Sequence, residues 1–176
     1  KLFNFDTALG ELFKSKILFN ENLSTNISVD IESNLNNEIF TSSKVKFNIV
    51  NGRINFDKTK LINKKIGSVE ISNSNLFFQN DNLILNSDLI IDIQKSEKLF
   101  SFFQTSKKLR KPIKNIFVNF DYDLLKKQLT INSLKIDQNI SNDKMLEIIE
   151  EIRNTEKYNL NKAKRVFNKL FSAYVG

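Results

Sequence analysis

An Asn-Gly pair, Asn51-Gly52, stands between two segments in which apolar and polar residues alternate, and it constrains the fold more than any other feature of the chain. The pair favours a two-residue type I′ turn, because both central residues of that turn need positive φ. A two-residue loop also fixes which residues of the two strands face each other. The predicted pairs are Val50 with Arg53, Ile49 with Ile54, Phe47 with Phe56, and Lys46 with Asp57. Because Ile49, Ile54, Phe47 and Phe56 fall on one side, the sequence predicts an antiparallel sheet with one apolar face.

Two further turns predict hairpins of the same kind. One turn is Asn80-Asp81 and the other lies near Lys126-Lys127, each between alternating segments. The predicted pairs are Phe78 with Leu83 and Leu76 with Leu85 in the second hairpin, and Leu124 with Leu129 and Tyr122 with Ile131 in the third. Ser87 is the one polar residue on the apolar face of its strand, which predicts a bulge or bend there.

Other segments add strands and helices to this framework. Alternation predicts strands over Ile27–Glu32 and Ser68–Ser72, and a strand end at Leu134 and Ile136, whereas Leu61–Lys65 is predicted to be a polar connection. Helical spacing predicts a short helix over Thr7–Lys14, an inserted helix over about residues 96–110, and two helices after Asn139. The stripes of the last two are Met145, Ile148, Ile149 and Ile152, then Leu160, Ala163, Phe167, Leu170, Phe171 and Tyr174.

These elements predict a mainly β fold that also contains helices. The expected architecture is a curved antiparallel meander sheet, an open or partly closed groove, with one inserted helix and two C-terminal helices. We expect a β-groove domain over residues 1–138 and a C-terminal helical segment over residues 139–176. Sequential hairpins without strand–helix alternation argue against a parallel α/β fold.

The composition excludes several kinds of chemistry. The chain contains no His and no Cys, which removes the commonest general base and metal ligand and all thiol nucleophiles. Its four Gly residues form no phosphate-binding loop. Asp121 and Asp123 share a strand face and are the best pair for a divalent ion, but the wet face of a sheet explains them better. We therefore predict a protein that is not an enzyme, with no catalytic residue, no metal and no cofactor.

The chain has a net charge of +7, which suits an anionic partner. Basic residues follow a Phe-rich segment, Leu99–Phe103, and two interpretations remain open. The segment lies at a membrane surface with basic residues at the headgroups, or it covers one end of the apolar sheet. The candidate membrane-surface residues are Phe102, Phe103, Lys107, Lys108, Arg110 and Lys111. No nucleic-acid partner is expected, because the strand aromatics fall on the apolar side instead of an exposed polar face.

The continuous apolar face of the sheet has two explanations. The sheet folds onto itself or onto its helices and makes an ordinary core. Alternatively, it curls into a trough whose lining is not filled by protein and holds acyl chains. Composition alone favours the ordinary core.

Several runs of the sequence resemble a known family. These are Ile49–Phe56 (IVNGRINF), Lys65–Ile71 (KIGSVEI), Leu83–Ile93, and the Leu99–Lys114 insertion that leads into Ile116–Asp123 (IFVNFDYD). Together they resemble the C-terminal β-rich region of AsmA-like proteins, over about residues 40–137. The resemblance implies a long twisted β-groove that moves or buffers phospholipid between the inner and outer membranes without catalysis. The positions it implies as groove lining are Phe47, Ile49, Ile54, Phe56, Val69, Ile71, Leu83, Leu85, Leu89, Ile91, Ile93, Val118 and Phe120.

The resemblance also implies a location and partners. We expect a periplasmic segment of a longer chain that an upstream helix anchors in the inner membrane, since this sequence begins at Lys1 and has no run of about 20 apolar residues. The expected partners are phospholipid acyl chains, the inner membrane and other envelope proteins. The alternative is a structural or assembly scaffold of the cell envelope, with a closed core and no lipid cargo.

Overall fold

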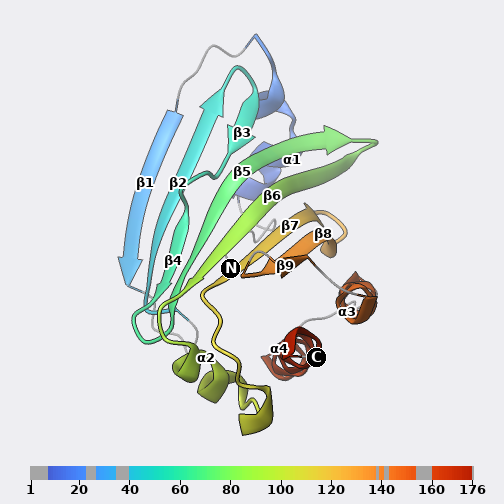
Figure 1. Ribbon diagram of the computed structural model, residues 1–176. Coiled ribbons are helices and arrows are strands. Elements are labelled where there is room, and N and C mark those ends of the chain that lie inside the picture. The colour runs from blue at the N-terminus through green and yellow to red at the C-terminus, as the bar shows by residue number, and fades with distance from the viewer. Residues whose placement is uncertain are drawn as a thin grey trace.

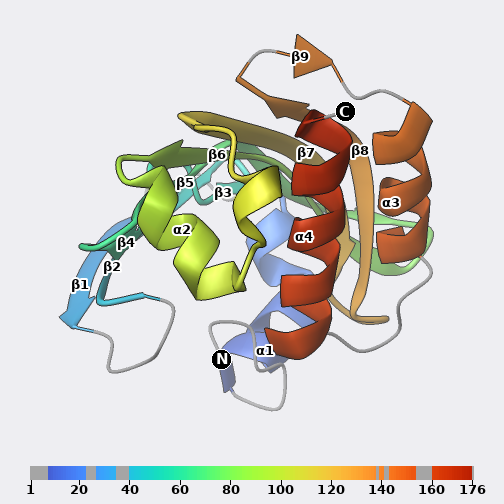
Figure 2. The same cartoon turned by 60° about the horizontal axis from the view of Figure 1, so that its bottom comes forward.

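The computed structural model describes residues 8–22, 27–34, 40–137, 139–140, 143–153 and 160–175. It shows a strongly curved antiparallel sheet with helices on one of its faces (Figure 1, Figure 2). The predicted fold class, a mainly β meander with an inserted helix and two C-terminal helices, is confirmed. We call the face of the sheet that carries the helices the inner face, and the opposite one the outer face.

Within the described residues nine strands form the sheet, in the order β1-β2-β3-β5-β6-β7-β8-β9, with β4 paired to both β2 and β5. The strands are β1 (Ile27–Asn34), β2 (Ser42–Val50), β3 (Arg53–Asn55), β4 (Lys60–Asn63), β5 (Gly67–Gln79), β6 (Asn82–Ile93), β7 (Asn115–Asp123), β8 (Gln128–Ile136) and β9 (Asn139–Ile140). The prediction of a polar connection over Leu61–Lys65 is wrong, because most of that segment belongs to β4. Leu61 lies opposite Val69 of β5, so its backbone is satisfied by the strands on either side.

The first two predicted hairpins have the expected register. Ile49 pairs with Ile54 across the Asn51-Gly52 turn, and Phe78 pairs with Leu83 across Asn80-Asp81. All four turn residues have positive φ, between 48° and 70°, as a type I′ turn requires.

The third hairpin is also present, but its predicted register is wrong. Tyr122 pairs with Leu129, and Phe120 pairs with Ile131. The connection runs over four residues, Leu124–Lys127, and the carboxylate of Asp123 holds it by accepting bonds from the N–H groups of Leu125 and Lys126 at 2.9 Å each. An Asx turn of this kind lengthens a loop without any Gly or Pro in the sequence.

The predicted Lys46–Asp57 pair does not form, because β3 ends at Asn55. The backbone of Lys46 instead bonds to Thr59. The Thr59 hydroxyl accepts from the Lys46 N–H and donates to the Lys46 carbonyl, each at 3.0 Å. The Asp57 carboxylate turns to β5 and accepts from the N–H and the hydroxyl of Ser74, at 2.7 and 2.6 Å. Asp57 therefore ties the β3–β4 connection to the bulge of β5.

Replacing Asp57 by alanine is expected to lower the free energy of unfolding by about 1.5–3 kcal/mol, because two hydrogen bonds to a charged acceptor are lost and Ser74 is buried. Chemical denaturation of the variant measures this. Asp92→Ala is the matched control, since Asp92 is exposed and its change should stay within about 0.5 kcal/mol. Equal unfolding free energies for both variants would remove this role from Asp57.

Two bulges curve the sheet. In β5 the register shifts between Ser72 and Asn75, opposite Ser87, whose hydroxyl donates to the Ser72 carbonyl at 3.1 Å. The polar Ser87 on an apolar face did mark the irregularity, although the extra residues belong to the neighbouring strand. In β8, Asn132 is the extra residue, because Asn119 pairs with Ser133 and Phe120 pairs with Ile131. Bulges increase the local twist, which bends the sheet around the helices.

The helices are α1 (Ala8–Lys14), α2 (Ser96–Phe103), α3 (Asp143–Arg153) and α4 (Leu160–Val175), with short 3₁₀ segments η1 (Ile17–Phe19) and η2 (Lys107–Leu109). Thr7, the predicted start of α1, lies outside the described residues. The inserted helix is shorter than predicted and ends at Phe103, because Gln104 adopts the left-handed conformation with φ 57°. No helix in the described part of the chain combines the length and apolar character needed to cross a bilayer.

Two hydrophobic clusters lie on the inner face. In one, Phe13 of α1 and Leu18 of η1 pack against the ends of β2, β3, β5 and β6. In the other, α2, α3 and α4 pack against β6, β7 and β8. The C-terminal helices thus share a core with the sheet, while the division into two domains stays a prediction.

Candidate functional site

The structure divides the predicted groove lining into two groups. Seven of the thirteen positions are buried under protein, which makes them core residues instead of an open lining. These are Ile49, Ile54, Phe56, Leu83, Leu85, Ile93 and Phe120. The cause is the covering helices, whose positions on the sheet the strand pattern does not show.

The other six positions are half-buried: Phe47, Val69, Ile71, Leu89, Ile91 and Val118. Three of them, Val69, Leu89 and Ile91, form one wall of a cavity of about 400 Å³, which we call the inner cavity. This wall is extended by Leu61 of β4, Ile66 of the β4–β5 turn and Gly67 of β5. The opposite wall comes from α2 and α4, through Leu99, Phe102, Phe103, Ala163 and Phe167. The inner cavity is therefore the part of the sheet face that the helices do not fill.

Aromatic packing holds the helical wall in place. The Phe103 ring stacks on Phe167, with centroids 4.3 Å apart, and Phe100 meets Phe171 edge to face at 5.3 Å. Ala163 lies one helical turn before Phe167 and has the smallest side chain in this wall. A stacked aromatic pair beside a small residue keeps the two helices close to each other but leaves space above the sheet.

Three residues with polar side chains, Asn63, Ser68 and Asp92, also border the inner cavity. The Asn63 side-chain oxygen already accepts from the N–H groups of Lys65 and Ile66, at 2.9 and 3.1 Å. Ser68 and Asp92 pair across β5 and β6, and by strand alternation from Val69 and Ile91 their side chains belong to the outer face. The space inside is consequently apolar.

The residues predicted for a membrane surface differ in how far they are exposed. Phe103 is only 9% exposed and Phe102 half-buried, and both belong to the inner cavity wall. Arg110 donates to the Thr105 carbonyl at 3.0 Å and to the Glu97 carboxylate at 3.3 Å. Lys107, Lys108 and Lys111 are exposed. Of the six predicted residues, only these three lysines are exposed to solvent, as contact with a membrane surface requires, and Phe102 and Arg110 are exposed in part.

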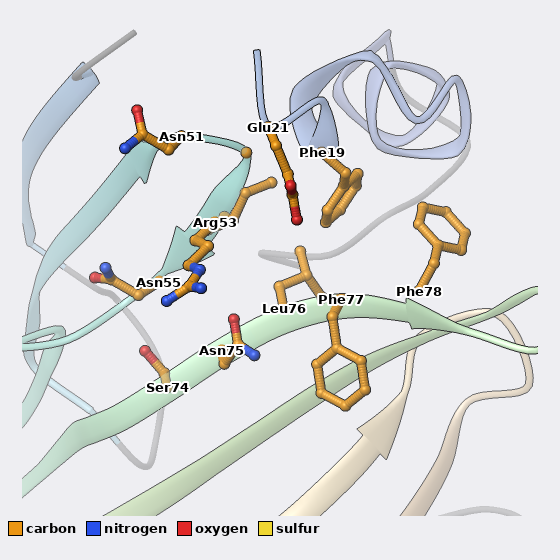
Figure 3. Close-up of a pocket in the computed structure, with 12 residues that line it drawn as sticks. Phe19, Glu21, Asn51, Arg53, Asn55, Ser74, Asn75, Leu76, Phe77 and Phe78 are labelled. Carbon is orange, nitrogen blue, oxygen red and sulfur yellow. The ribbon is translucent and has the colours of Figure 1, made fainter. Parts of the chain in front are cut away.

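A second hollow, the hairpin cleft, has a volume of about 700 Å³ and lies where β3 and β5 diverge (Figure 3). The two strands share a single register pair, Ile54 with Leu76. Arg53 points from β3 toward β5, and Glu21 reaches in from the segment after η1 (Figure 3). Among the described residues neither side chain has an ion-pair partner. The sequence does not predict this cleft, because nothing in the alternation shows that β3 stops after three residues.

The acidic residues considered for a cation belong to hydrogen-bond networks. Asp121 accepts from Asn86 at 2.7 Å and from Asn132 at 2.9 Å, and Asp123 caps the turn after β7. Within the described residues no group of three or more acidic side chains is placed to hold a metal ion.

Glu151 joins α3 to α4, because its carboxylate accepts hydrogen bonds from Lys169 and Arg165 of α4. The hydrogen bond from Lys169 is the main reason that the pKa of the Glu151 carboxyl is lowered.

The fold and cavity define a class of protein: a curved antiparallel sheet that carries helices and an apolar cavity on its inner face. Comparisons with protein-family models, with curated proteins and with solved structures find no match for this chain. The resemblance to AsmA-like proteins therefore stays a prediction from the sequence.

Proposed function

We propose that this chain is a non-catalytic, lipid-handling groove segment of an AsmA-like envelope protein, and that the inner cavity receives acyl chains. The observation that supports the proposal most directly is the apolar lining of the cavity. A polar ligand would lose its hydration there without gaining hydrogen bonds. An acyl chain instead gains about 0.8 kcal/mol for each methylene group that leaves water.

The size of the inner cavity limits the cargo. About 400 Å³ is at the small end of the range for ligand cavities in proteins. The rest of the predicted groove is filled by side chains of α1, η1, α2, α3 and α4. This chain alone would hold a short stretch of lipid, and transport between the inner and outer membranes would need further groove beyond it.

A photoreactive benzoylphenylalanine at Ile91 is expected to capture lipid when the chain is produced in bacterial cells, because Ile91 faces the inner cavity. The same group at Ile90 should capture none. Ile90 is the adjacent isoleucine of β6, but it is 41% exposed and belongs to the outer face. Mass spectrometry of the crosslinked protein identifies the lipid.

A pair of variants on α4 provides an independent check. Ala163→Phe should fill the cavity and remove most of the captured lipid, whereas Asn161→Phe adds the same ring at an exposed position and should not. Equal labelling at Ile90 and Ile91, or labelling that survives Ala163→Phe, would count against the proposal.

The runner-up function is a scaffold or assembly domain of the envelope. The seven buried groove positions favour it, since they form an ordinary core. It predicts that benzoylphenylalanine at Ile91 captures no lipid and that Ala163→Phe changes stability alone.

A further inference from the structure

We infer that the inner cavity selects a single-chain amphiphile with an anionic, oxygen-bearing headgroup, and that Lys164 holds this headgroup at the cavity mouth. The inference rests on the proposed function, because it concerns the headgroup of the molecule whose chain the cavity takes. The chemistry covers both a carboxylate and a phosphate ester.

The position of Lys164 is the first step. Its neighbours on α4, Ala163 and Phe167, both line the cavity. The Lys164 ammonium lies 5.7 Å from the ring centroid of Phe102, which lines the cavity from α2. A half-buried lysine whose ammonium lies over an aromatic wall brings positive charge to the edge of the apolar space.

Lysines dominate the charge of two segments that adjoin cavity-lining residues. The β4–β5 turn carries Lys64 and Lys65, and the start of α2 carries Lys95 and Lys98. The N–H groups of Gln94 and Lys95 both donate to the Ile66 carbonyl, at 2.9 and 3.1 Å, and so join these two basic segments. In the described part of the chain none of these four lysines has an ion-pair partner.

The acidic side chains near these segments form ion pairs or lie on the outer face of the sheet. Glu97 pairs with Arg110 at 3.3 Å, and Glu70 pairs with Lys60 at 3.6 Å. Asp92 is exposed on the outer-face side of β6. An anionic headgroup at the mouth therefore meets several cations, and a cationic headgroup would be repelled.

The small volume of the cavity, about 400 Å³, favours one chain with one headgroup. A free fatty acid and a single-chain phosphate lipid satisfy this equally. A binding experiment distinguishes between them.

Displacement of the neutral dye Nile red from the purified chain tests the inference. The four competitors share a twelve-carbon chain and differ in headgroup: dodecanoate, dodecyl phosphate, dodecanol and dodecyltrimethylammonium, each kept below its micelle concentration. At least one anion should displace the dye at about three- to tenfold lower concentration than dodecanol, and the cation should be weakest. The tighter anion identifies the headgroup, and salt should reduce its advantage.

Lys164→Ala should weaken the anions far more than dodecanol, so that the anions then displace the dye at about the same concentration as dodecanol. Lys135→Ala is the matched control, because the Lys135 ammonium also lies 5.7 Å from an aromatic ring, that of Phe117, but on β8 away from the cavity. Thermal melting shows whether both variants fold, and Lys164→Gln replaces the alanine variant if it does not.

The outcomes separate the two proposals. If none of the four competitors displaces the dye and benzoylphenylalanine at Ile91 captures no lipid, the proposed function fails. If all four bind equally, or if Lys164→Ala keeps the preference for anions, the cavity binds chains but the headgroup inference is wrong.

Discussion

Replacing Gly67 by alanine is expected to destabilise the protein by about 2–6 kcal/mol, the sum of roughly 1–3 kcal/mol for overpacking and 1–3 kcal/mol for a strained backbone. Gly67 has φ +155°, a value that residues with a side chain rarely adopt. A Cβ atom at this position would lie 1.9 Å from the backbone carbonyl oxygen of Asp92, which cannot rotate away. Because Gly67 pairs with Ile93 and all the clashing atoms belong to β6, the clash would push β6 away from β5 at this end.

Chemical denaturation and thermal melting measure this change. Ser68→Ala is the control in the next position of β5, where an alanine meets no such clash, and it should shift the unfolding free energy by less than about 0.5 kcal/mol. The Gly67 variant should also bind less lipid, since Gly67 belongs to the cavity wall. A Gly67→Ala protein that melts like the Ser68 variant would show that the strands can move apart at little cost.

Phe171→Ala is expected to cost about 3–5 kcal/mol, the range for removing a buried phenylalanine from a well-packed core. Phe171 is 0% exposed and touches the rings of Phe100, Phe103 and Phe167, at centroid distances of 5.3, 6.1 and 6.0 Å. Its loss would loosen α4 from α2, and the stacked pair of Phe103 and Phe167 would lose its support. For a chain of this length the melting temperature should fall by roughly 6–20 °C.

Leu146→Ala provides the comparison, because Leu146 is a helical apolar residue that is 53% exposed and should change stability by less than about 0.5 kcal/mol. Displacement of Nile red shows whether this loss of stability also changes lipid binding in the cavity. If α4 forms the cavity wall, the Phe171 variant should lose affinity for every competitor to the same degree, whatever its headgroup. A variant that keeps its affinity would place the bound chain elsewhere.

Local signals predicted the sheet well. The pairs Ile49 with Ile54 and Phe78 with Leu83 followed from turn chemistry alone, because a two-residue turn leaves one register. Ser87 marked a bulge through its polarity. Ile148 and Phe171, placed on apolar stripes by helical spacing, are both buried.

Three other predictions are wrong, each for a different physical reason. The Lys46–Asp57 pair is absent because Ser74, in another strand, binds Asp57. The third hairpin took a different register because the Asp123 side chain builds a longer turn. The inserted helix ends early at Gln104, where no Gly or Pro signals a stop.

The sequence by itself determined which residues belong to one apolar face, because side-chain direction in a strand alternates with a period of two and needs no knowledge of the rest of the chain. Only the tertiary structure decided what that face touches. Seven of its predicted positions lie under the helices, and Val69, Leu89 and Ile91 border a cavity. The difference depends on where α2 and α4 cross the sheet, and the α4 contacts join segments about 70–100 residues apart in the sequence.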